Sequence, residues 1–120
     1  MTNETEIDAA ALERLQRFGG GKLLREMIAL FLEHAPARVL AARAGMDAGD
    51  ADAVRSALHS LKSSAAQLGA TGLQDACSRG EELARAGSLA ELPAVVAEVE
   101  QECPRVLAKL DAIRQETAAS

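Results

Sequence analysis

Short breaks between amphipathic stretches limit the possible folds of this chain more than any other feature of its sequence. Apolar residues recur at helical spacing from residue 8 to about residue 113, and turn-forming residues interrupt them at GGG (19–21), DAGD (47–50), Gly69 and Gly87. No stretch has the strict alternation that predicts a strand. Because short connections join antiparallel neighbours, the sequence predicts an all-α fold: an up-down antiparallel four-helix bundle with a short additional N-terminal helix.

The breaks divide the chain into five predicted helices. Their spans are residues 8–18, 22–46, 51–68 and 71–86, followed by a last helix that comes after Ser88 and ends near Ile113. Asp8 and Asp50 are of the type that caps helix N-termini, and Gly69 is of the type that ends a helix. Pro36 is expected to kink the second helix without ending it, since the apolar pattern resumes after it. Two pairs have the spacing of a capping box, Thr71 with Gln74 and Ser88 with Glu91.

Length and composition indicate one domain with an aliphatic core. A chain of 120 residues is long enough for one core, and 48% apolar with 26% charged residues is typical of a soluble globular protein. Aromatic residues make up only 2%, so Leu, Val, Ile and Ala must fill the core, which suits close-packed helices. We therefore expect a single domain over residues 1–120 with flexible ends at 1–7 and 115–120. The initiating Met and the polar ends suit a free-standing domain.

Charge and hydropathy argue against several classes of partner. A net charge of −5 and the scarcity of aromatics disfavour nucleic acid, whose binding uses clustered cations and stacking platforms. No apolar run approaches the roughly 18 residues of a membrane span, and the start MTNETEIDAA lacks the pattern of a signal peptide. Cys77 and Cys103 lie far apart without a CxxC motif or a nearby histidine, so we expect two small buried thiols. The expectation is a monomeric cytoplasmic protein that binds neither nucleic acid nor membrane.

His59 is predicted to lie opposite the apolar stripe of its helix, although leucines flank it in sequence. At about 100° per residue, five apolar positions fall roughly 100° to 180° away from it: Val54, Leu58, Leu61, Ala65 and Leu68. A second set falls within about 60° of it: Asp52, Arg55, Ser56, Lys62, Ser63 and Ala66. The histidine therefore belongs to a polar face that is exposed to solvent.

Position alone leaves several interpretations of His59 open. An exposed helix histidine without any role is common on a solvated face, whereas a metal site is less favoured because no second His, Cys or Glu lies three or four residues away. The face does fit phosphoryl chemistry, since a neutral imidazole has a lone pair and can act as a nucleophile. Lys62 can place an ammonium against phosphate oxygens, and Ser56 and Ser63 can add hydroxyl donors. Ala66 keeps the next turn flat for an approaching partner.

The string HSLKSSAAQLGA (59–70) resembles the signature of histidine-containing phosphotransfer (HPt) domains of two-component phosphorelays. That signature runs His, any residue, Leu, Lys, Gly, Ser or Ala, a small residue, two more, an apolar residue, Gly and Ala. The matching positions are His59, Leu61, Lys62, Ser64, Ala65, Leu68, Gly69 and Ala70. FLEHAPARV (31–39), AGDADAVRSALH (48–59) and GEELARAG (80–87) also resemble parts of the family. The resemblance spans most of the chain.

The resemblance implies a phosphorelay intermediate. By analogy with the family, His59 accepts the phosphoryl group, Lys62 assists it electrostatically, and Leu61, Leu68 and Gly69 are structural. HPt domains have no kinase activity of their own and carry the group between aspartates of response-regulator receiver domains, one of which can belong to a hybrid histidine kinase. The receiver supplies Mg²⁺ and the acidic pocket, so no cofactor is expected in this chain. Arg55, Ser56, Ser63 and Ala66 are expected to face the partner.

Two further positions, Ser63 and His34, bear on this assignment. Ser63 stands where the family usually has Gly, one turn after His59, and it is expected to alter transfer rate or partner choice without abolishing function. His34 lies beside Met27, Leu30 and Phe31 on its helix and is interpreted as a boundary or packing residue.

Two further functional classes compete with the phosphorelay hypothesis. The alternative is a non-catalytic receiver-binding or scaffold module that uses the same helix face. An enzyme in its own right has little support, because no acid/base carboxylate pair, Cys–His pattern or Gly-rich phosphate loop is visible.

Overall fold

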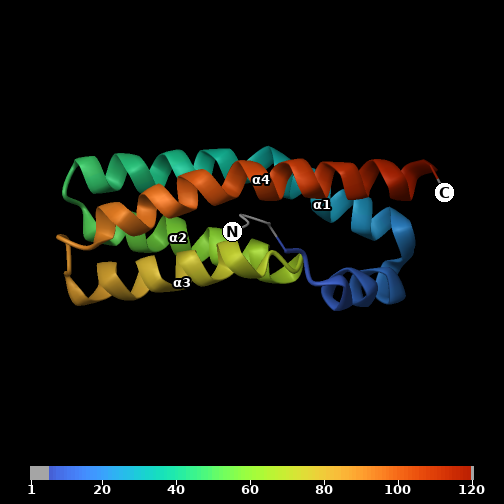
Figure 1. Ribbon diagram of the computed structural model, residues 1–120, viewed down its shortest axis with the longest axis horizontal. Helices are drawn as coiled ribbons and strands as arrows, with labels where there is room; N and C mark the ends of the chain where they lie inside the picture. The colour runs from blue at the N-terminus through green and yellow to red at the C-terminus, as the bar shows by residue number, and fades with distance from the viewer. Residues whose placement is uncertain (1–5, 120) are drawn as a thin grey trace, which may run out of the picture.

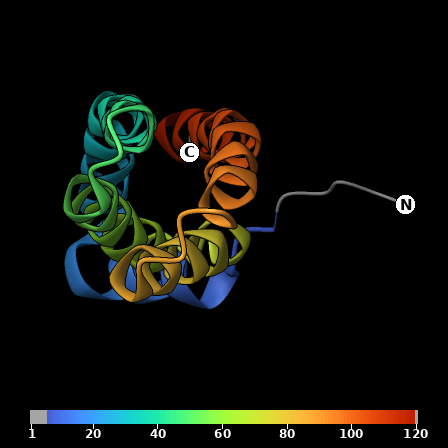
Figure 2. The ribbon, with the colours of Figure 1, turned by 90° about the vertical axis from the view of Figure 1, so that its left-hand side faces the viewer.

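The computed structural model describes residues 6–119, which form four helices. These are α1 (Ala9–Asp47), α2 (Ala51–Gln67), α3 (Thr71–Ala86) and α4 (Leu92–Ala119). They run side by side along the long axis of the molecule (Figure 1). Each helix packs against two neighbours, α1 and α3 both contacting α2 and α4, so the four stand at the corners of a square in the end view of Figure 2. The predicted all-α four-helix bundle is confirmed, and strand-like pairing within residues 6–119 is limited to one isolated bridge between Ile7 and Ala70.

A break at Gly20 separates the additional N-terminal helix from the rest of α1. Gly20 has φ 73° and ψ −173°, and it is the residue within α1 whose backbone leaves the helical region. A side chain rarely tolerates these angles, so a glycine is needed at the bend. In Figure 1 the blue start of α1 accordingly lies out of line with the rest of the helix. The predicted short helix and its glycine stop are confirmed. Pro36 does not end the helix, as predicted, and the kink predicted there stays a prediction.

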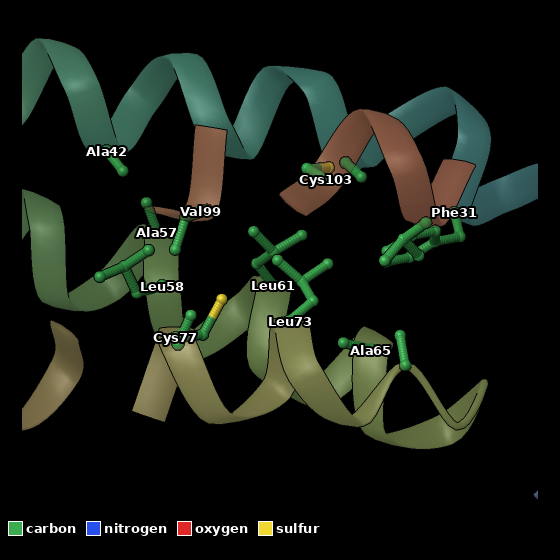
Figure 3. Packing of buried hydrophobic residues seen from close by; sticks show 14 of the residues in the cluster. Phe31, Ala42, Ala57, Leu58, Leu61, Ala65, Leu73, Cys77, Val99 and Cys103 are labelled. Atoms are coloured by element: carbon green, nitrogen blue, oxygen red, sulfur yellow. The ribbon is translucent and has the colours of Figure 1, made fainter. Parts of the chain in front are cut away.

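Aliphatic side chains from all four helices fill the centre of the bundle. The largest of those that are fully buried are Leu24, Ile28, Leu58, Leu61, Leu68, Leu73, Leu92, Leu110, Val54, Val96, Val99 and Val106. Figure 3 shows part of this core, where Leu58 and Leu61 of α2 face the same interior as Leu73 of α3 and Val99 of α4.

Both cysteines belong to this core, as predicted, and both are free thiols. Burial raises the pKa of Cys77 to about 12 and that of Cys103 to about 11. The thiols are therefore neutral at physiological pH, and they act as packing groups.

The helix ends agree with the sequence at two N-caps and differ at the capping boxes. The Asp8 side chain accepts a hydrogen bond from the Ala10 amide, and that of Asp50 accepts one from the Ala53 amide, each at 3.1 Å.

The predicted capping boxes are wrong. Ala70 caps α3 without a side-chain bond, because the tight connection from α2 buries Ala70 and leaves Thr71 inside the helix. Ser88 and Glu91 lie in the turn before α4, where the Glu91 amide donates to the Ser88 carbonyl oxygen at 3.3 Å.

The flexibility predicted for the two ends stays a prediction, and the structure shows contacts at both of them. Helix α4 continues to Ala119, so the segment 115–119 is helical, and the Thr117 hydroxyl donates to the Ile113 carbonyl oxygen at 2.8 Å. Near the other end, Ile7 makes its bridge to Ala70, and the Asp8 amide donates to the Gly69 carbonyl oxygen at 2.8 Å. Sequence periodicity gave no sign of either contact, because a polar helix end and a backbone bridge leave no apolar pattern. Residues 1–5 and 120 of the two predicted ends lie outside the described residues.

Candidate functional site

His59 lies on the outward face of α2, where the helical wheel places it. Its side chain is 60% exposed, whereas its neighbours Leu58 and Leu61 are buried in the core. The difference follows from the helical turn of about 100° per residue, which separates sequence neighbours in space. The exposure predicted for His59 is confirmed, and the imidazole is accessible to a second protein.

A buried carboxylate that sequence reasoning missed holds the imidazole. Glu81 of α3 has a side chain that is only 5% exposed, and its Oε2 lies 2.9 Å from Nδ1 of His59. Its other oxygen, Oε1, lies 2.7 Å from Nζ of Lys62. The structure thus brings His59 and Lys62 of α2 together around one carboxylate from the neighbouring helix.

Close packing of α3 against α2 makes this contact possible. Gly80 lies against Leu58, and a Cβ at position 80 would stand 2.5 Å from the Leu58 Cδ1 atom. The absence of a side chain at Gly80 lets the two helices approach and brings Glu81 level with His59. A signal for Glu81 was present in the sequence. It falls on the apolar stripe of the fourth predicted helix, four residues after Cys77 and three before Ala84, where a charge needs a partner.

The charge on Glu81 is maintained by its cationic neighbours. Burial by itself raises the pKa of the Glu81 carboxyl, but the Lys62 ammonium and the His59 ring outweigh burial, and the net pKa lies below its usual value. The carboxyl is therefore ionised at neutral pH and can only accept hydrogen bonds. It follows that Nδ1 of His59 carries the proton that is donated to Glu81. In the neutral ring Nε2 then holds the free lone pair, on the side away from the carboxylate.

A third basic side chain reaches the same carboxylate from α3 itself. Arg85 places one guanidinium nitrogen 3.3 Å from Oε2 of Glu81 and the other 2.9 Å from Oε2 of Glu82. The Arg85 side chain is 53% exposed and that of Glu82 is 72% exposed, so this part of the cluster is open to solvent. Sequence reasoning did not select Arg85, because its connection to His59 passes through another helix.

The remaining predicted residues lie around His59 on α2. Ser56 and Ser63 are exposed and Ala66 is half-buried. The Arg55 side chain is 40% exposed, and its Nε is 3.8 Å from the exposed carboxylate of Asp52. All four residues share the outward face of α2 with His59, as the helical wheel predicts, and their contact with a partner stays a prediction.

His34 lies at the boundary of the core, one of the two alternatives that its sequence neighbours allow. It is exposed, and it lines a groove between α1 and α2 together with Leu30, Arg38, Ser64 and Gln67. The adjacent core positions are filled by Phe31 and Ala35, so His34 is not itself a packing residue.

Residues 6–119 have no group of three or more His, Cys, Asp or Glu side chains arranged to hold a metal ion. None of its helices combines the length and the apolar character needed to cross a membrane.

Comparisons with known proteins agree with this arrangement. A family model described as Hpt domain matches residues 26–116. A solved structure, the crystal structure of histidine-containing phosphotransfer protein B (HptB) from Pseudomonas aeruginosa PAO1, is similar with a TM-score of 0.86 and 30% sequence identity. That similarity covers 92% of this chain and 95% of the HptB chain. A search of curated protein sequences finds no match.

Proposed function

Because the chain belongs to the Hpt domain family, we propose that it is a phosphorelay intermediate whose phospho-acceptor is His59. In this proposal His59 takes a phosphoryl group from an aspartate of one receiver domain and passes it to another, or back. Family membership supports a histidine phosphotransfer role in a two-component system. The observation that carries the assignment to His59 is its exposed imidazole, whose Nδ1 is bound to a buried carboxylate and whose Nε2 is free.

The bonds at His59 account for the transfer chemistry. The Nε2 lone pair attacks the phosphorus of the receiver's aspartyl phosphate, an N–P bond forms, and the P–O bond to the aspartate breaks. The aspartate carboxylate leaves with the electron pair. The Nδ1 proton stays in its hydrogen bond to Glu81, and the carboxylate balances the positive charge that the ring acquires. In the reverse direction a neutral imidazole is the leaving group.

The rest of the machinery belongs to the partners in this proposal. The chain has no kinase activity of its own, and the receiver domain supplies Mg²⁺ and the acidic pocket around its aspartate. Receiver domains, including that of a hybrid histidine kinase, dock on the face formed by Arg55, Ser56, Ser63 and Ala66. The side chains on this face are polar or small and exposed or half-buried, so they leave His59 accessible.

Transfer from a charged receiver domain tests the proposal. A panel of receiver domains is charged with radiolabelled acetyl phosphate in the presence of Mg²⁺, and each is mixed with the native chain or with the His59→Gln variant. We expect an acid-labile, alkali-stable label on the native chain and none on the variant, with unchanged helicity by circular dichroism. Equal labelling of the variant would refute the assignment to His59. Binding of a receiver without label on the native chain would instead identify a non-catalytic receiver-binding module.

A further inference from the structure

Two cations, Lys62 and Arg85, contact Glu81, and they differ in the length of that contact and in their exposure to solvent. We propose that Arg85 binds the phosphoryl group once His59 carries it, while Lys62 serves as the counter-ion of Glu81. This inference rests on the proposed function, since it needs a phosphoryl group on His59. It reverses the role that the sequence motif assigns to Lys62.

Lys62 is held in place by a buried charge. Its ammonium lies 2.7 Å from Oε1 of Glu81, and the Lys62 side chain is only 29% exposed. Among the described residues, Lys62 is the cation that pairs with this oxygen. If Lys62 moved out to a phosphoryl group, it would leave a buried carboxylate oxygen without its counter-charge, which is among the costliest changes in a protein interior. Lys62 therefore stays with Glu81.

Arg85 has weaker and more exposed partners. It contacts Oε2 of Glu81 at 3.3 Å, and the same oxygen already accepts the shorter bond from His59 at 2.9 Å. Its second partner, Glu82, is largely exposed, and an exposed ion pair contributes little. If Arg85 leaves both carboxylates, Oε2 keeps its hydrogen bond to the His59 ring. Moving Arg85 thus costs less than moving Lys62.

The position and chemistry of Arg85 suit a phosphoryl group on His59. Arg85 and Nδ1 of the imidazole contact the same carboxylate oxygen, so the guanidinium starts on the Nδ1 side of the ring and has to swing round its edge to reach a phosphoryl group on Nε2. A guanidinium can donate two parallel hydrogen bonds to phosphate oxygens, whereas an ammonium acts as a point charge. Phosphorylation adds anionic oxygens to the same histidine ring, and an exposed, loosely paired arginine can swing away from its carboxylate partners to bind them.

An equilibrium measurement isolates this contact from docking to the partner. The native chain and its variants are each mixed with the receiver domain that labels the native chain fastest, and the label is followed until its distribution between the two proteins is constant. The resulting equilibrium constant compares only the free phosphorylated and unphosphorylated proteins. Contacts made within the docked complex therefore cancel from it.

Four variants divide the roles of the cations. Arg85→Ala removes the proposed phosphoryl ligand, and Arg85→Lys keeps the charge but not the paired donors. Lys62→Met keeps the side-chain stem without the charge. Arg79→Ala is the matched control, because Arg79 lies on the same helix, is likewise 53% exposed and pairs with the exposed carboxylate of Glu98. Thermal unfolding is recorded for every variant.

The expected pattern assigns the two cations different effects. Arg85→Ala lowers the equilibrium constant for phosphorylation of the chain about tenfold, the scale of one charge-assisted hydrogen bond, and Arg85→Lys lowers it less. Arg79→Ala stays within about twofold of the native chain. Lys62→Met mainly lowers the thermal midpoint, because Glu81 loses its counter-ion.

Two results would overturn the inference without touching the proposed function. One is an Arg85→Ala variant that matches Arg79→Ala, which would mean that Arg85 makes no phosphoryl contact. The other is a Lys62→Met variant whose equilibrium constant falls below that of Arg85→Ala, which would return the phosphoryl contact to Lys62. A native chain that no receiver labels would refute the proposed function itself.

Discussion

Two glutamates that pair with cations between helices differ in what they do for the molecule. Glu100 of α4 is 33% exposed and accepts two hydrogen bonds from Arg43 of α1, at 2.8 and 2.6 Å. Glu81 of α3 is 5% exposed and shares its two oxygens among Lys62, His59 and Arg85. Both carboxyl pKa values lie below the usual value. For Glu100 the main cause is the hydrogen bond from Arg43, whereas for Glu81 the largest influence is burial, which acts in the opposite direction and is outweighed by its neighbours.

The comparison separates a structural pair from a functional cluster. The Arg43 guanidinium donates two hydrogen bonds to the Glu100 carboxylate, and this pair orients no reactive group. At Glu81 three side chains share one buried carboxylate, and one of them is an exposed imidazole. The buried charge therefore fixes a proton on Nδ1 of His59 and leaves Nε2 as a nucleophile.

The largest predicted effect is on phosphotransfer when Glu81 is replaced. Glu81→Ala removes both the acceptor for Nδ1 and the charge, and we expect it to slow labelling by the receiver on the order of 100-fold. Glu81→Gln keeps an acceptor oxygen and so the tautomer, and it should lose about tenfold. Stopped-flow or quench-flow labelling gives both rates.

Glu100→Gln is the control for this experiment, and it should label at the native rate. If Glu100→Gln were slowed as much as Glu81→Gln, the effect would come from general electrostatics or from the bundle as a whole. The distinction between the two glutamates would then be wrong.

A smaller effect is predicted for stability as a function of pH. The folded-state pKa of Glu81 is lowered, so its ionisation favours the folded protein above the usual carboxyl pKa, and this contribution is lost as the pH falls through the folded-state pKa. The free energy of unfolding of the native chain should therefore fall relative to that of Glu81→Gln as the pH drops from about 5 to about 3. Urea unfolding at each pH measures the difference. A difference that stays constant or grows on acidification would contradict the direction of the pKa shift.

The smallest predicted effect concerns Glu100. Its pair with Arg43 is partly exposed, so Glu100→Gln should cost less than about 1 kcal/mol in the free energy of unfolding at neutral pH. The cost should shrink further in about 0.5 M NaCl, because salt screens exposed charges. A loss that is larger than this and insensitive to salt would show that the Arg43 pair behaves like a buried one.

Much of the fold and half of the site were predictable from the sequence. Periodic apolar residues and the glycine breaks predicted the bundle and the bend at Gly20, and the wheel predicted that His59 is exposed while Leu58 and Leu61 are buried. The Thr71–Gln74 capping box failed because the α2–α3 connection is tighter than its spacing assumes, and the helical segment 115–119 was missed because it is polar. A local sequence pattern carries information about one helix at a time. Predictions from it are therefore reliable where contacts within that helix determine the structure.

By itself, the sequence determined which face of α2 carries His59, because the turn of a helix is set by backbone geometry. Only the tertiary structure decided what that histidine can do. Glu81 and Arg85 reach His59 from another helix, more than twenty residues away in the chain, through an approach that Gly80 permits. That contact determines which ring nitrogen of His59 carries the proton. It also makes Lys62 the counter-ion of Glu81 and leaves Arg85 more weakly paired. Electrostatic pairing depends on distance in space, and helix packing rather than helix periodicity sets that distance.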